Sequence, residues 1–244
     1  MEKQDYNIQI NPQEGTETIR VIHEPVATRE IHEWNTRGYE LDSLQAVMNL
    51  VVRKGTREHT VIFYTEDAVR VILDDSIQDR PLDKATYAFT LSDQFDAWCE
   101  LLNKRLTQRE LVNSLKRLDA NELPQRDQLI ANLRKLQVAT VITAGYEFDD
   151  AGNLNVAYRE TNGREGIMAL PNVINPDLPI LNESDYQVMI EIELELIKPK
   201  ADDERPMIVL TCPKKDVYIK NAVAHEVKKL KSNLPQHLIL AGSW

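Results

Sequence analysis

Acidic side chains recur at every second position of one apolar segment. They are Glu191, Glu193 and Glu195 of "YQVMIEIELELI", residues 186–197, and Lys198 follows them. Acids and a lysine near the end of a strand are typical of metal-dependent nucleases, whose acids hold the cation. The spacing here is E-x-x-K rather than E-x-K, and no partnering aspartate is evident upstream. The alternation therefore predicts a strand with one buried and one solvated face, as in an antiparallel sheet.

Lysines gather in the segment 214–231, which has the apolar periodicity of an amphipathic helix. They outnumber its acids, Asp216 and Glu226, which gives a local net charge of +4 (six minus two). On an acidic protein such a helix predicts a contact with phosphate groups or with an acidic partner. The alternative is a solvated helix whose last turn favours cations. The candidate ligand-binding or nucleic-acid-binding residues are Lys214, Lys215, Lys220, Lys228, Lys229 and Lys231.

No other residue pattern matches a catalytic or metal-binding motif. The sequence lacks the nucleophile elbow G-x-S-x-G, the Walker A phosphate loop and the dinucleotide fingerprint G-x-G-x-x-G. His-Glu pairs occur at 23–24, 32–33 and 225–226, but none has the second histidine four positions on that a zinc-protease helix needs. Cys99 and Cys212, the only cysteines, make no metal or redox spacing. We therefore expect a protein that is not an enzyme, with no catalytic residue, no metal ligand and no cofactor.

Length and composition are those of an ordinary globular protein. The chain has 244 residues, of which 42% are hydrophobic and 28% charged, so it can bury a sizeable core. The formal net charge of -10 disfavours nucleic acid as a partner without forbidding it, and it fits a protein partner better. The polar start "MEKQDYNIQINPQEG" lacks a signal-peptide core, and no apolar run approaches the ~20 residues that cross a bilayer. These features predict a cytoplasmic protein with no membrane partner.

The first half of the chain carries clear signals for helix ends. Asp42 is the expected N-cap of a helix that ends before Gly55. The β-branched runs "HTVIFYT" and "AVRVIL" are typical of a hairpin, and a third strand, "TYAFTL", follows. Ser92 then caps one helix, and Thr107, with a glutamate three residues later, caps the next as a capping box. These signals predict a helix, a sharp corner and a second helix.

The second half predicts more strands than helices. A helix over about 125–136 leads into a hairpin of "QVATVITAGYEF" and "LNVAYRE". The strand at 186–197 pairs back with "MIVLT", and the lysine-bearing helix and a last strand, "HLILAG", follow. The predicted fold class is α+β, with mostly antiparallel sheets and the C-terminal helix packed on the sheet. We expect an N-terminal arm with a short strand at 1–40 and a single domain at 41–244, with a sub-boundary near 120–126.

The order of these motifs resembles a known family. A strand, a helix containing "AW", the segment "LTQRELVNSLK" and a helix leading into "LQVATVITAGYEF" resemble the YfdQ-like family of phage and prophage proteins, domain of unknown function 2303. The closing "LPQHLILAGSW" is similar to the short Pro-to-Gly end of that family. The resemblance covers about Leu44 to Trp244, and the first forty residues do not match. It implies a phage or prophage gene acting in the bacterial cytoplasm, and it brings no assigned activity and no catalytic residues.

Three functions remain open at this point. The first is a non-catalytic phage accessory protein that binds a host or phage protein, or a small nucleotide, to counteract host defence, and that self-associates as a homo-oligomer through strand edges. The second is a nucleic-acid-associated protein of phage recombination or replication, with the lysine helix at the phosphates. The third is an enzyme, either a metal-dependent nuclease or one that degrades a signalling nucleotide. The lack of reaction chemistry favours the first.

Overall fold

The computed structural model describes residues 37–76, 83–119, 121–148, 153–160, 165–197 and 206–243. All of them fall within one compact unit, Asn35–Trp244. Most of the expected N-terminal arm, including its short strand, lies outside the described residues. The predicted α+β class is confirmed, because helices and mostly antiparallel sheets follow one another along the chain. Within the described ranges, no helix combines the length and the apolar character needed to cross a membrane.

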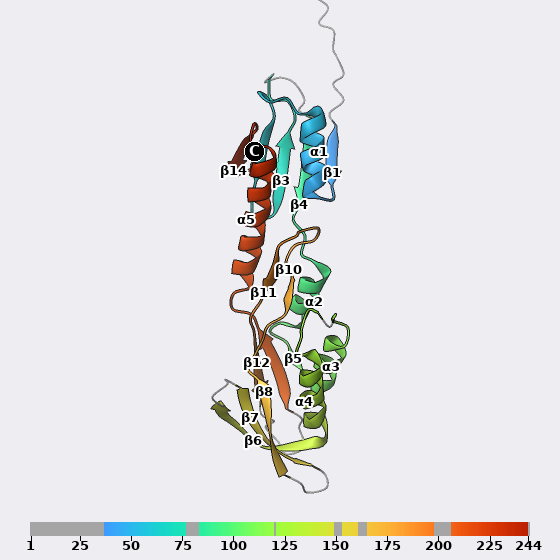
Figure 1. Ribbon diagram of the computed structural model, residues 1–244, viewed down its shortest axis with the longest axis vertical. Helices are drawn as coiled ribbons and strands as arrows, with labels where there is room; N and C mark the ends of the chain where they lie inside the picture. The colour runs from blue at the N-terminus through green and yellow to red at the C-terminus, as the bar shows by residue number, and fades with distance from the viewer. Residues whose placement is uncertain are drawn as a thin grey trace, which may run out of the picture. The chain divides into compact units, whose positions relative to one another are not determined.

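A five-stranded sheet contains the first hairpin and the last strand (Figure 1). Its strands, in spatial order, are β1 (Gly38–Leu41), β4 (Lys84–Ala88), β3 (Ala68–Ile72), β2 (Val61–Tyr64) and β14 (Leu238–Ala241). The three inner strands pair antiparallel, as predicted, whereas β1 and β14 pair parallel to their neighbours. Strands that pair in parallel are not joined by a tight turn. No local turn signal in the sequence therefore predicts that β1 pairs with β4 or that β14 pairs with β2.

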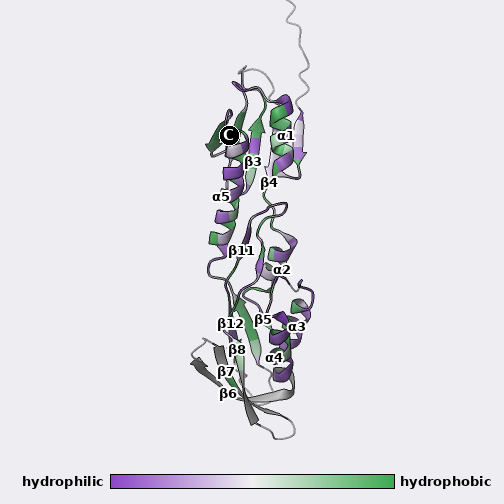
Figure 2. Cartoon of the chain, in the orientation of Figure 1, coloured by the Kyte–Doolittle hydropathy of each residue, from purple (hydrophilic) through white to green (hydrophobic). Residues whose placement is uncertain are grey.

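The helix α1 (Leu44–Lys54) packs its apolar side on one face of this sheet (Figure 2). The expected cap, Asp42, is wrong by one residue, because the Oγ atom of Ser43 accepts the backbone N–H three residues on at 3.1 Å. Serine and aspartate cap about equally well, so side-chain type alone could not decide between them. The helix ends at Gly55, where an added Cβ would lie 2.5 Å from the carbonyl oxygen of Val51. Glycine avoids that clash.

The predicted helix–corner–helix unit is confirmed. Its elements are α2 (Asp93–Leu101), β5 (Arg105–Leu106) and α3 (Gln108–Leu115). Ser92 caps α2 by accepting the N–H of Phe95 at 3.1 Å, and its hydroxyl donates to the carbonyl oxygen of Pro179 at 2.5 Å. Thr107 and Glu110 form the capping box of α3, because the Thr107 N–H donates to the Glu110 carboxylate at 2.8 Å. The Thr107 cap thus involves only nearby residues, whereas the Ser92 cap also bonds to Pro179, which is distant in sequence.

The remaining elements form a helix and three further sheets. They are α4 (Arg126–Val138), β6 (Ala139–Phe148), β7 (Asn153–Glu160), β8 (Glu165–Pro171), β9 (Val173–Ile174), β10 (Asp177–Pro179), β11 (Gln187–Met189), β12 (Ile192–Ile197) and β13 (Met207–Thr211). The sheets have the orders β6-β7-β8, β5-β13-β12-β9 and β10-β11, and all their pairs are antiparallel. The proline-rich segment 171–180 contains the short strands β9 and β10.

The single strand predicted over 186–197 is two strands, β11 and β12, and that prediction was wrong. At the break, the N–H of Ile190 still continues the pairing of β11 with β10, because it donates to the carbonyl oxygen of Pro176 at 2.9 Å. The next N–H, that of Glu191, donates to the hydroxyl of Tyr218 at 3.1 Å. The alternation itself is confirmed, because the apolar side chains of β12 are buried and its glutamates are exposed.

The helix α5 (Lys215–Asn233) contributes to two apolar clusters. Its first turns pack Tyr218 and Val223 into the cluster that contains α2 and α3. Its last turn packs Leu230 against α1 and the five-stranded sheet. The prediction of an amphipathic helix packed on a sheet is therefore confirmed, and the side of α5 that faces away from both clusters presents lysines.

Candidate functional site

The helix α5 divides the six candidate lysines between two of its flanks. Successive residues of an α-helix are rotated by about 100°, so positions 220, 228 and 231 fall on one flank. The groove lysines are Lys220, Lys228 and Lys231, and the far-flank lysines are Lys214, Lys215 and Lys229. The structure brings together the first three around one cavity and places the other three elsewhere. Only half of the predicted set therefore shares a site.

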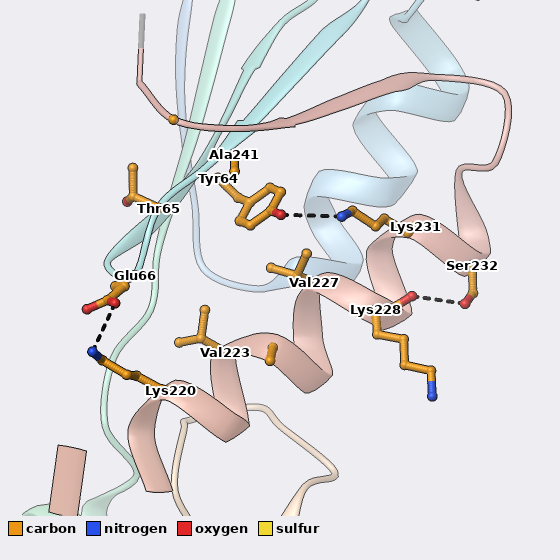
Figure 3. A pocket seen from close by; sticks show the side chains of 12 residues that line it. Tyr64, Thr65, Glu66, Lys220, Val223, Val227, Lys228, Lys231, Ser232 and Ala241 are labelled. Carbon is orange, nitrogen blue, oxygen red and sulfur yellow. Dashed lines mark hydrogen bonds and ion pairs between the residues drawn. The ribbon is translucent and has the colours of Figure 1, made fainter. Parts of the chain in front are cut away.

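An open groove of about 860 Å³ lies between α5 and the paired strands β2 and β14 (Figure 3). Its floor is apolar: Val223 and Val227 point into it from α5, and Tyr64 and Ala241 come from the two strands. The floor exists because β2 and β14 run parallel with Ala241 beside Tyr64. The groove thus combines an apolar base with a basic rim.

The charges at the rim are only partly balanced. The ammonium of Lys220 lies 3.4 Å from the carboxylate of Glu66, and both side chains are more than half exposed. Lys231 donates to the hydroxyl of Tyr64 at 3.3 Å, and its ammonium lies 4.9 Å from the centre of that ring. Lys228 has no ion pair among the residues that the structure describes. Three lysines against one glutamate leave the groove with a net charge of +2 (three minus one).

The far-flank lysines, by contrast, are engaged with acids or thiols of the same chain. Lys214 forms an ion pair with Glu191 at 2.6 Å, and this contact raises the pKa of Lys214. Lys229 donates to the carboxylate of Asp185 at 3.2 Å. This bond and a second one from His225 lower the pKa of Asp185. Lys215 lies beside the thiol of Cys99. A phosphate ligand would have to displace these partners.

Two acids and a histidine, none of them selected from the sequence, meet on the far flank. The ligand atoms of Asp185, His225 and Glu226 lie within 4.8 Å of one another, an arrangement that could hold a metal ion. However, one carboxylate oxygen of Asp185 already lies 3.2 Å from the ammonium of Lys229 and 3.2 Å from a ring nitrogen of His225. The buried Glu226 accepts a hydrogen bond from Ser184 at 2.6 Å. The cluster therefore has an internal cation and serves to dock the loop before β11 onto α5.

The acidic strand does not converge on a site. Glu193 and Glu195 are exposed on β12, and Glu193 accepts a hydrogen bond from the Thr211 hydroxyl at 3.3 Å. Glu191 belongs instead to the ion pair with Lys214, and Lys198 lies outside the described residues. The acids of the nuclease alternative are thus solvated or paired with side chains of this chain.

The two cysteines are distant in sequence but neighbours in space. An isolated bridge joins Leu102, just after α2, to Leu210 of β13, and Cys99 and Cys212 flank this bridge. Burial raises the pKa of both thiols, and each is close enough to Lys215 for the ammonium to act in the opposite direction. Sequence spacing could not reveal this proximity, because it depends on the bridge between Leu102 and Leu210.

Comparison with models of known families, with curated proteins and with solved structures found no match. The resemblance to the YfdQ-like family therefore stays a prediction, and the function of the groove is inferred from its geometry.

Proposed function

We propose that this chain is a non-catalytic binding protein that takes an acidic segment of a partner protein in the groove of α5. The observation that supports this function is the groove itself, whose floor of Val223, Val227 and Tyr64 is rimmed by three lysines. Burying one aliphatic side chain contributes about 1.5–3 kcal/mol, whereas an exposed ion pair contributes about 0–1 kcal/mol. Apolar contact would supply the affinity, and the lysines would select acidic partners.

The groove has few groups suited to catalysis, and its one carboxylate, Glu66, is paired with Lys220. Its hydroxyls are Tyr64, Thr65 and Ser232, and the Ser232 hydroxyl already donates to the carbonyl oxygen of Lys228 at 2.9 Å. No histidine or cysteine of the described residues lines it. A nucleophile needs an adjacent base, and a general base needs a suitable group within hydrogen-bond reach of a substrate. Binding without catalysis is the function that these side chains support best.

Nucleic acid is the weaker alternative. A nucleic-acid backbone binds best to a row of cations that have no acidic partners, because affinity rises with the number of phosphates neutralised. The lysines of α5 lie on two flanks, and Lys214, Lys220 and Lys229 have acidic partners. A groove with an apolar floor offers little to a phosphodiester chain, so a protein segment, rather than DNA, a small nucleotide or an enzymatic substrate, is the ligand that we propose.

The resemblance to phage and prophage proteins adds a setting to this proposal. In that setting the partner is a host or phage protein of the bacterial cytoplasm, and counteracting a host defence is one use of such binding. The groove, with its local net charge of +2, is opposite in sign to the chain as a whole, whose formal net charge is -10.

The test uses two matched charge-reversal variants of the full chain. One carries Lys220→Glu, Lys228→Glu and Lys231→Glu, and the other carries Lys214→Glu, Lys215→Glu and Lys229→Glu. Both change the formal charge by the same amount on the same helix. The probes are two fluorescein-labelled glutamate–leucine peptides of equal composition, one with strict alternation and one with helical spacing. A lysine–leucine peptide and single-stranded DNA serve as comparators, and fluorescence anisotropy reports binding.

We expect at least one acidic peptide to bind and the lysine–leucine peptide not to bind. Each reversal at the rim should cost about 0.5–1 kcal/mol, so the groove variant should bind roughly ten- to a hundredfold more weakly. The far-flank variant should stay within about threefold of the parent. Failure of both acidic peptides to bind the parent would refute the proposal. DNA binding that falls steeply with salt and weakens equally in both variants would instead support the nucleic-acid function.

A further inference from the structure

Building on the proposed function, we propose that the acidic partner segment binds as an added β-strand beside β14. Strand addition to an exposed sheet edge is a common way to recognise extended peptides, because main-chain hydrogen bonds supply affinity and alternate side chains supply specificity. The groove lies directly beside such an edge: β14 is the outermost strand of the five-stranded sheet (Figure 1). Among the described residues, β14 pairs with β2 alone.

The backbone of β14 leaves its outer edge ready to pair. The N–H of Gly242 donates to the carbonyl oxygen of Tyr64 at 2.9 Å, so this residue points its backbone groups toward β2. In a parallel pair, alternate residues direct both N–H and C=O to the same neighbour. Ile239 and Ala241 therefore direct their N–H and C=O groups away from β2. No strand of the described chain occupies that side, where an incoming segment would find two donors and two acceptors.

The two faces of β14 then determine the side chains of the partner. Ala241 lines the groove, so an added strand would turn every second side chain toward the outer flank of α5. That flank presents Lys228 and Lys231 beside the valines of the floor, so a glutamate on this side of the strand would place its methylene stem over the valines and its carboxylate toward the lysines. The opposite face presents Leu238 and Leu240, which are 54% and 40% exposed.

The expected partner is therefore an extended segment whose acids cover the apolar floor with their methylene stems on the helix side, and whose apolar residues meet Leu238 and Leu240 on the other side. A second copy of this chain fits less well. Its own β14 is "LILA", without an acid, and symmetric pairing of two such edges would bring two sets of groove lysines together. Like charges that meet across an interface suppress association. Pairing between copies is thus the outcome that the charges oppose.

The experiment places backbone N-methyl groups on alternate residues of the alternating glutamate–leucine peptide. The two isomers have the same composition and differ only in which set of N–H groups is blocked. One set faces β14 in the proposed geometry, and the other set faces solvent. We expect one isomer to bind at least tenfold more weakly than the parent peptide and the other to stay within about threefold. On the protein, Ala241→Pro removes an outward N–H without touching the ladder to β2, and should also weaken binding.

Three results would overturn strand addition while leaving the proposed function intact. They are equal effects of the two N-methyl isomers, tighter binding of the helically spaced peptide, and unchanged hydrogen exchange at Ile239 and Ala241 when the alternating peptide binds. If neither acidic peptide binds the parent protein, the proposed function fails first, and strand addition fails with it. A rise in mass to that of a dimer, lost with the Ala241→Pro variant, would identify a second copy as the occupant and would also overturn the proposal.

Discussion

Replacing Ser92 with alanine should destabilise the protein more than the loss of an ordinary helix cap. The Ser92 hydroxyl accepts the N–H of Phe95 at 3.1 Å and donates to the carbonyl oxygen of Pro179 at 2.5 Å. The side chain is only 3% exposed, so water cannot replace either partner easily. One hydroxyl thus closes the first turn of α2 and holds the segment of β10 against it.

The size of the effect follows from these two bonds. Loss of a serine cap costs about 1 kcal/mol. Leaving a buried carbonyl without its donor costs about another 1 kcal/mol, at the low end of the usual range. The sum, about 2 kcal/mol, should lower Tm by roughly 4–8 °C in a chain of this size.

The assay is thermal unfolding followed by circular dichroism, with urea unfolding as a second measure. Thr107→Ala is the matched comparison, because its hydroxyl serves only the cap and Glu110 within the same turn. We expect that variant to lose about 1 kcal/mol, half the loss of Ser92→Ala. If Ser92→Ala is no more destabilising than Thr107→Ala, the bond to Pro179 contributes nothing and the reasoning is wrong.

Further predictions concern packing, thiol reactivity and alkaline pH. Gly55→Ala should destabilise by about 1–3 kcal/mol through the close contact at the end of α1, whereas Gly38→Ala, with nothing within 4 Å of the new Cβ, should leave the urea midpoint unchanged. Cys99 and Cys212, whose pKa values are raised by burial, should react with a disulfide reagent more slowly than free cysteine at pH 8 and at full speed in urea; equal rates would contradict this. Burial likewise raises the pKa of Tyr87, so its contribution to stability is complete below about pH 10 and lost as the pH rises through the folded-state pKa. Tyr87→Phe should therefore flatten the fall in Tm above about pH 10, and an unchanged slope would count against it.

The parts of the fold that the sequence predicted are those specified by nearby residues. The caps at Ser92 and Thr107 depend on atoms within three residues, and the apolar stripes of α1 and α5 depend on helical spacing. The break between β11 and β12 was missed because it depends on Tyr218, which reaches the strand from a helix later in the chain. The last strand, β14, was predicted, but its parallel pairing with β2, like that of β1 with β4, was missed because the partners are distant in sequence.

The candidate site was predicted in part. The lysines were selected by local charge, and the helical rotation that separates Lys220 from Lys229 is present in the sequence. Which flank borders a groove depends on where α5 rests on β2 and β14, and local patterns do not contain that information. The cluster around His225 and the neighbouring thiols depend on tertiary approach in the same way.

The parallel pair of β2 and β14 has a consequence for how the protein folds. Its two strands are far apart in sequence, so forming this pair closes a loop that contains most of the described chain. Loop-closure entropy makes such long-range contacts slow to form, whereas the hairpin of β2 and β3 can form early. We expect the groove to be among the last features to form. Incompletely folded chains would then lack the groove and would not bind the partner.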